Sequence, residues 1–165
     1  LAGSTPEVLV AHVAARTSRI RVGSGGVMLS HYSALKVAEN FRMLETLYPG
    51  RIDLGIGRAP GSDQRTARAL AHGPGALGIE HFPSQIGDLI GFLRGDLPQG
   101  HPFRGIRAMP DGPTMPELWL LGSSDEGAAL AARFGTAFSF AHFINDEGGA
   151  EAARAYAARF RPGVL

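Results

Sequence analysis

Residues 20–29 read Ile20-Arg21-Val22-Gly23-Ser24-Gly25-Gly26-Val27-Met28-Leu29. A short apolar run interrupted by glycines predicts a buried strand with an unusual backbone at its carboxyl end. Consecutive glycines there allow backbone dihedral angles that other residues avoid, or the close approach of a flat ligand. A β-bulge is the simpler structural explanation of the same glycines.

The chain on both sides of this strand alternates between two hydrophobic periodicities. Helical patterns cover residues 4–17, 33–48, 62–71, 82–93, 124–134 and 148–160, and strand patterns cover residues 20–29, 51–57, 117–122 and 137–140. Alternating strands and helices predict parallel pairing with right-handed crossovers. The predicted fold class is therefore α/β, as an open doubly wound sheet or a barrel, and periodicity does not decide between them.

Local signals indicate where helices begin and where a long loop lies. Ser4 and Glu7 have the spacing of a capping box, with Pro6 in the first helical turn. Ser124 is placed to cap the helix that follows the third predicted strand. Residues 95–116 contain five prolines and four glycines, which predicts a long loop that could include a short hairpin.

Composition narrows the classes of function. The 165 residues are 44% hydrophobic and 19% charged, which is typical of one soluble globular domain. A net charge of +1 argues against a nucleic-acid surface, and no apolar run approaches the ~20 residues that cross a bilayer. The absence of cysteine excludes disulfides and thiolate chemistry and fits a cytoplasmic protein. Six histidines without metal-ligand spacing predict no metal site.

Three glycine-rich segments lie at the carboxyl ends of predicted strands, where α/β proteins bind ligands. They are residues 23–26, 55–61 and 122–125. The third has the clearest chemistry, because a glycine allows close approach and Ser123 and Ser124 open a helix. Unpaired N–H groups and the helix dipole at such a point favour a phosphate, although helix caps are common and a simple cap is the favoured explanation of Ser124 taken alone.

The second segment, residues 55–61, approximates a dinucleotide fingerprint and then departs from it. Gly-x-Gly-x-x-Gly requires glycine where Pro60 stands, which disfavours an open-sheet NAD enzyme. Arg58 can grip a phosphate, and a surface arginine is the equal alternative. His142 could line a site or be a buried structural histidine, and Asp53 is expected to be a structural hydrogen-bond acceptor rather than a base.

Several segments carry a joint pattern in a fixed order along the chain. The most specific are residues 19–29, 31–33 and 131–135, Leu44-Glu45-Thr46-Leu47-Tyr48-Pro49-Gly50-Arg51-Ile52-Asp53-Leu54-Gly55-Ile56-Gly57-Arg58, and Glu117-Leu118-Trp119-Leu120-Leu121-Gly122-Ser123-Ser124. Together they resemble the bacterial luciferase-like family of flavin-dependent monooxygenases, from about Leu1 to Phe160. The resemblance implies a TIM-type (β/α) barrel and reduced FMN, with O2 activated through a flavin hydroperoxide. It also implies a separate reductase that supplies the reduced flavin.

The resemblance also implies roles for residues of this chain. The flavin ring would lie over Gly57 and over a non-prolyl cis peptide bond, which here is Gly25–Gly26. His142 matches a position near the flavin and is the one catalytic candidate that the chain offers. The phosphate grip matches, at the ends of the second and third strands, Arg58, Gly122, Ser123 and Ser124.

A complete (β/α) barrel typically needs ~250 residues. We therefore expect residues 1–165 to form one partial barrel domain that corresponds to about strands three to six. The family's catalytic histidine belongs to a segment before Leu1, so we expect the family's activity not to survive in this chain alone. Two alternatives remain: a non-catalytic flavin- or F420-binding protein, and a subunit that completes a barrel with a second chain, including a homo-oligomer. The sequence leaves the small-molecule substrate undefined.

Overall fold

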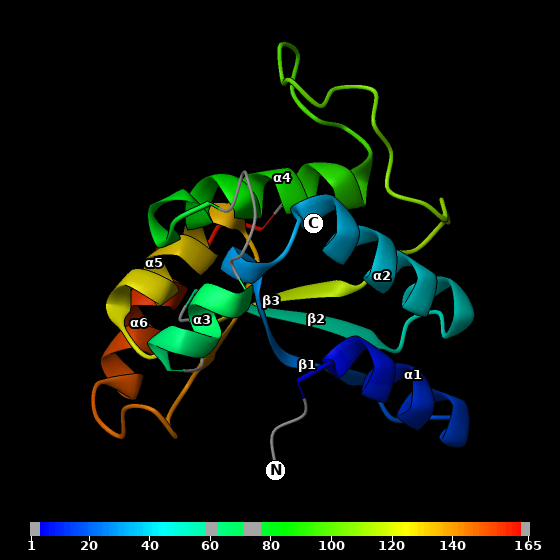
Figure 1. Cartoon of the computed structure of the whole chain (residues 1–165). Coiled ribbons are helices and arrows are strands. Elements are labelled where there is room, and N and C mark those ends of the chain that lie inside the picture. Colours follow the sequence, from blue (N-terminus) through cyan, green and yellow to red (C-terminus); the bar gives the residue numbers. More distant parts are fainter. Residues whose placement is uncertain (1–3, 59–62, 71–76, 163–165) are drawn as a thin grey trace.

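The computed structural model describes residues 4–58, 63–70 and 77–162. One parallel sheet has the strand order β1-β2-β3-β4, formed by β1 Val22–Met28, β2 Ile52–Gly57, β3 Glu117–Gly122 and β4 Ala137–Phe140. The helices are α1 Pro6–Arg16, η1 Leu29–His31, α2 Ala34–Leu47, α3 Gln64–Leu70, η2 Ile79–His81, α4 Phe82–Arg94, α5 Asp125–Phe134 and α6 Gly149–Arg159. The predicted α/β class, with parallel strands joined through helices, is confirmed (Figure 1).

Helices α1, α2, α4 and α5 share one hydrophobic core with the strands of the sheet. Helices α2 and α4 pack together on one side, while α1 packs against β1 below (Figure 1). Helix α5 packs against β3 and β4, and α6 packs against α5. Ile52, Leu54 and Ile56 of β2 are fully buried. These three side chains alternate along β2 and therefore share one face of the sheet, whereas Asp53 and Gly57, on the other face, are only partly buried. The helix-covered face accounts for the apolar side chains of this strand.

An irregular seam joins β1 to β2. The register is regular from Val22 to Gly25 and shifts between Gly25 and Val27, which agrees with the β-bulge that was the simpler explanation of these glycines. The buried Ser24 hydroxyl donates to the carbonyl of Gly55 (2.8 Å) and accepts from its N–H (3.0 Å). The Gly25–Gly26 peptide bond is cis, at the position that the family resemblance indicated. A side chain therefore supplies hydrogen bonds where the strand ladder is interrupted.

Two helix starts differ from the sequence prediction. The predicted capping box of Ser4 and Glu7 is wrong, because Thr5 is the N-cap residue and no side chain caps the first turn of α1. Pro6 does occupy that turn, and its missing N–H leaves one group fewer to satisfy. Ser124 is the N-cap residue of α5 as predicted, but its side chain makes no capping hydrogen bond.

The proline-rich loop of residues 95–116 runs outward beyond α2 and α4 (Figure 1). It contains no strand, so the expected short hairpin is wrong, although the long loop itself is confirmed. The buried Arg42 donates to the carbonyl of Ala108 (3.3 Å) and to Asp111 (2.7 Å). These hydrogen bonds from α2 hold the loop in place. The prolines of the loop have no N–H group to donate, so the loop does not form a strand ladder of its own.

Parts of the prediction fall outside the described residues. These are Pro60, on which the argument against an NAD enzyme rests, and positions 62 and 71 at the ends of the predicted third helix. The part of that helix that the structure describes is α3. Throughout the described ranges, no helix combines the length and the apolar character that crossing a bilayer requires.

Candidate functional site

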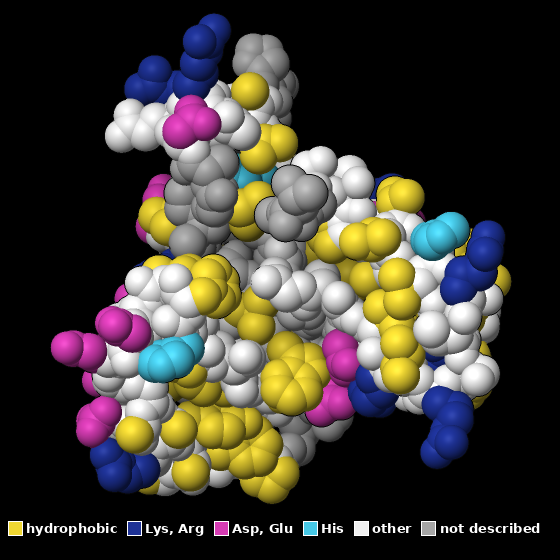
Figure 2. Space-filling model, turned by 90° about the horizontal axis from the view of Figure 1, so that it is seen from below, with side chains coloured by type: hydrophobic (Ala, Val, Ile, Leu, Met, Phe, Trp, Pro, Cys, Tyr) yellow, Lys and Arg dark blue, Asp and Glu magenta, His cyan; other side chains and the backbone are white. Residues whose placement is uncertain are grey.

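A cavity of about 840 Å³ runs along β1 to the carboxyl ends of β2, β3 and β4. Helix α1 forms one wall, and the chain that follows β4 forms the opposite rim. Seen from below, hydrophobic side chains lie on both sides of a central recess (Figure 2). Ligand pockets typically have volumes of ~300–1,000 Å³, so this cavity has room for a cofactor-sized molecule.

The predicted cofactor residues meet in this cavity. Parallel pairing places Gly57 of β2 opposite Leu121 of β3, which brings Arg58 beside the turn that follows β3. All of the predicted positions line the cavity: Gly25, Gly26, Gly57, Arg58, Gly122, Ser123 and Ser124. Their contact with a cofactor remains a prediction, whereas their convergence follows from the register of the sheet.

The cavity positions are occupied by glycine for different reasons. A Cβ atom on Gly25 or Gly57 would meet no atom within 4 Å, so both positions face open space. A Cβ atom on Gly26 would lie 2.6 Å from both the carbonyl oxygen of Gly55 and the Cδ1 atom of Leu121. Close packing therefore accounts for Gly26, while Gly25 and Gly57 leave room that a flat ring can occupy.

The turn after β3 has the features of an anion site. A Cβ atom on Gly122 would lie 3.2 Å from the Cα atom of Gly127, so strand end and helix start touch closely. The first N–H groups of α5 have no acceptor within the helix, and the helix dipole makes this end positive. Because the Ser124 hydroxyl is not used as a cap, it is available to bind a ligand at the same place.

Arg58 carries the one charged side chain among the described residues that line the cavity. Its Nη1 atom lies 2.6 Å from Oε2 of Glu126, in the first turn of α5, and the two side chains are 41% and 61% exposed. This ion pair was not predicted from the sequence. The parallel register was the available signal, since it brings the residue after β2 beside the helix after β3.

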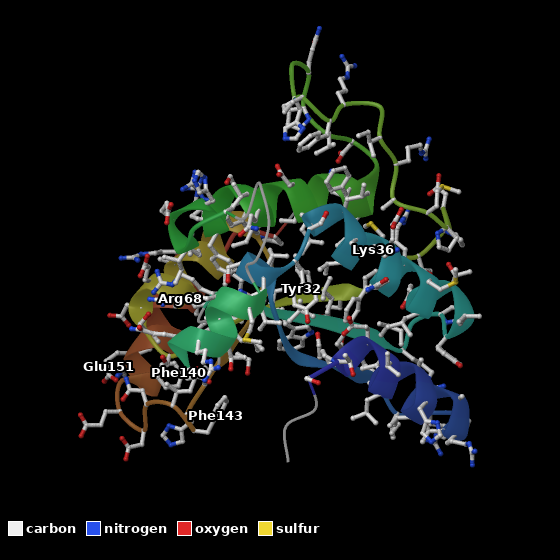
Figure 3. The ribbon with its side chains drawn as sticks, in the orientation of Figure 1. Tyr32, Lys36, Arg68, Phe140, Phe143 and Glu151 are labelled. Atoms are coloured by element: carbon white, nitrogen blue, oxygen red, sulfur yellow. The ribbon has the colours of Figure 1, made fainter. Side chains whose placement is uncertain are left out.

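The chain that follows β4, which forms the opposite rim of the cavity, is hydrogen-bonded to the turn after β3. The N–H of Ala141 donates to the carbonyl of Gly122 (2.9 Å), and the Asn145 side chain donates to the carbonyl of Ser123 (3.2 Å). These bonds hold Phe143 and Ile144 at the cavity edge, although the two side chains are 85% and 62% exposed. Phe143 projects outward beyond the end of β4 (Figure 3). Neither this apolar rim nor the wall formed by α1 was predicted from the sequence.

His142 does not belong to the cavity. Its side chain is exposed and is absent from the lining, and its ring lies 6.3 Å from that of Phe140. The expectation of a buried histidine is therefore wrong, while a catalytic role for His142 remains a prediction. The N–H of His142 donates to the carbonyl of Phe140, and this tight turn directs the neighbouring Phe143, rather than the histidine, to the cavity edge.

Asp53 acts as the structural acceptor that the sequence predicted, near the amino ends of the strands. It accepts hydrogen bonds from Arg21 and from the indole N–H of Trp119 (3.2 Å). The hydrogen bond to Asp53 raises the pKa of Arg21. Arg21 also pairs with Glu117 (3.1 Å), so these charges connect the beginnings of three strands. Such contacts stabilise a parallel sheet at the end opposite to its ligand site.

The family model described as luciferase-like monooxygenase matches residues 2–163. The chain belongs to the luciferase-like monooxygenase family. Over 165 residues it is 56% identical to the uncharacterized protein YwcH of Bacillus subtilis (strain 168), covering 100% of this chain and 49% of that protein. It is also 46% identical to N-acetyl-S-alkylcysteine monooxygenase of the same organism, over 99% of this chain and 49% of that protein.

A solved structure supports the same assignment. The crystal structure of apo-MsnO8 superposes with a TM-score of 0.84 at 46% sequence identity, covering 96% of this chain and 46% of that one. The four-stranded parallel sheet therefore corresponds to part of a luciferase-like monooxygenase fold, which agrees with the predicted partial barrel. The chain spans about half the length of the curated relatives that it matches.

Within the part of the chain that the structure describes, no three His, Asp or Glu side chains are grouped so that they could hold a metal ion. The cavity walls are mainly apolar, with contributions from Leu9, Val13 and Phe82. The site therefore combines one corner that holds the Arg58–Glu126 ion pair, beside the turn after β3, with a large uncharged remainder. This arrangement suits a ligand with one anionic group and a broad apolar body.

Proposed function

We propose that this chain forms the cofactor-binding part of a flavin-dependent monooxygenase, which acts with O2 on a small organic substrate. Reduced FMN is the proposed cofactor, delivered by a separate flavin reductase. The proposal starts from membership of the luciferase-like monooxygenase family and extends it to a cofactor and a set of residues. In this chemistry the reduced flavin supplies the electrons that convert one oxygen atom of O2 to water, while the other enters the substrate.

One observation carries the proposal. Three segments that are distant in sequence, one within β1 and two at the carboxyl ends of β2 and β3, meet in a single cavity that has the Arg58 side chain at one corner. FMN has a phosphate at one end and a flat ring system at the other. The cavity offers Arg58 and an uncapped helix start for the former, and open space over Gly25 and Gly57 for the latter.

Each group in the corner would have its own task. The Arg58 guanidinium provides a fixed positive charge and several donors for phosphate oxygens. The Ser123 and Ser124 turn adds hydroxyl groups and first-turn N–H donors of α5. The apolar walls from α1 and from the chain after β4 would exclude water around the ring and accept the uncharged part of a substrate.

The experiment is a titration of the purified chain with oxidised FMN and with riboflavin, followed by flavin fluorescence. We expect FMN to bind with a discrete stoichiometry and at least about tenfold more tightly than riboflavin, because only FMN has the phosphate. Arg58→Gln should remove most of that difference. Arg154→Gln, on the exposed face of α6, is the matched control and should leave it unchanged. Equal affinities for FMN and riboflavin would contradict the proposed phosphate corner.

A second function is favoured by one observation. The one catalytic candidate in the sequence, His142, is exposed and lies outside the cavity lining. In this second function the chain would bind a flavin, or the deazaflavin F420, without catalysing a reaction. Tight binding of FMN or F420 with no oxygenated product, when reductase, O2 and a small organic substrate are supplied, would favour this function over the monooxygenase.

A further inference from the structure

The proposed phosphate corner contains a negative group of its own. Glu126 lies in the first turn of α5, and its carboxylate is 2.6 Å from the Arg58 guanidinium. The cation expected to hold a phosphate is therefore already paired within the protein. Any anion that binds Arg58 from the cavity must share the guanidinium with this carboxylate or displace it.

The ion pair between Arg58 and Glu126 is weak enough to be broken. Both side chains are substantially exposed, at 41% for Arg58 and 61% for Glu126. Exposed ion pairs contribute little to stability, because water screens the charges and the long side chains lose freedom. Holding Arg58 in place is thus a weak function for Glu126, while repulsion between its carboxylate and a neighbouring phosphate is unavoidable.

We propose that Glu126 competes with the cofactor phosphate for Arg58 and so limits how strongly the site prefers a phosphorylated flavin. This inference rests on the proposed function, in which FMN occupies the cavity. A partly neutralised grip suits a cofactor that must return to a reductase between turnovers, because a weaker phosphate contact allows faster release. Glu126 is in this sense a specificity-determining residue for the phosphate end of the ligand.

The test compares the dissociation constants of FMN and riboflavin for the wild type, Glu126→Gln and Glu151→Gln. Glu151 is the matched control, because it also pairs with an arginine, Arg154 at 2.8 Å, is exposed on α6 and is not among the residues that line the cavity. We expect Glu126→Gln to tighten FMN binding by about three- to tenfold, the range for removing one partly screened repulsive charge. Riboflavin affinity should stay the same, and Glu151→Gln should change neither ligand.

A double variant separates competition for Arg58 from a general effect of charge. In the Arg58→Gln background, adding Glu126→Gln should no longer improve FMN binding, because the group for which they compete is gone. An equal gain in that background, or unchanged or weaker FMN binding by Glu126→Gln alone, would overturn the inference while FMN binding itself stands. If wild-type chain binds neither FMN nor riboflavin, the proposed function fails and this inference fails with it.

Discussion

Two groups of glycines in β1 and β2 have opposite surroundings. In the seam between the strands, a Cβ atom on Gly55 would lie 2.1 Å from the carbonyl oxygen of Ser24, and one on Gly26 would lie 2.6 Å from the carbonyl oxygen of Gly55. At the cavity, Gly25 and Gly57 have nothing within 4 Å of a Cβ atom. The seam glycines let two backbones touch, whereas the cavity glycines leave space empty.

This difference distinguishes glycines that the fold requires from glycines that a ligand would require, although the two kinds lie within a few residues of each other. A side chain in the seam has to push β1 and β2 apart, so the sheet itself forbids it. A side chain at Gly57 meets no protein atom, so folding alone does not require glycine there. Space that the protein leaves unfilled at strand ends is where we expect the flavin ring, and substitutions along β2 can test that division.

Gly55→Ala should have the largest effect. The added methyl group collides with a backbone carbonyl that cannot turn away, and we expect the free energy of unfolding to fall by about 3 kcal/mol. Chemical denaturation of the chain gives the measurement. An unchanged unfolding midpoint would mean that the seam is looser than its glycines indicate.

Ser24→Ala should have an intermediate effect on stability. The buried hydroxyl pairs with both the carbonyl and the N–H of Gly55, and its loss leaves two buried backbone groups without this partner. We expect a loss of about 2 kcal/mol in the free energy of unfolding. Ser84→Ala, which removes one exposed hydrogen bond to the carbonyl of His81, is the control and should cost less than about 0.5 kcal/mol. Equal losses for both variants would remove the special role of Ser24.

Gly57→Ala should have the smallest effect on stability and a clear effect on binding. Position 57 lies two residues from Gly55 on the same strand, but here the added methyl group enters open space. The free energy of unfolding should therefore change by less than about 0.5 kcal/mol. FMN affinity should fall about tenfold, since one misplaced methyl group in a fitted pocket has an effect of this order. A stable variant with unaltered FMN binding would place the ring elsewhere.

Much of the fold could be predicted from the sequence, because it depends on local patterns. The apolar strands and helical stripes located β1 to β4 and the helices between them to within a few residues. Glycines and serines at three strand ends located the candidate site, since parallel strands end on one edge. The resemblance to a family added the cis peptide bond at Gly25–Gly26, which local patterns do not encode.

The features that could not be predicted from the sequence depend on side-chain direction and on contacts between residues that are distant in sequence. Helix capping was wrong at Ser4, because several neighbouring residues can cap and the backbone chose Thr5. His142 was misplaced, because one turn decides which of several adjacent side chains faces the cavity. The pairing of Arg58 with Glu126 required the register of two strands that are far apart in sequence.

The central claim is that the carboxyl ends of these strands hold FMN by its phosphate and leave room for its ring. The most direct measurement is a crystal structure of the chain soaked with FMN. We predict the phosphate within hydrogen-bond distance of the Arg58 guanidinium and the Ser124 hydroxyl, with the flavin ring over Gly25 and Gly57. A phosphate bound away from Arg58, or a ring outside the cavity, would contradict the account.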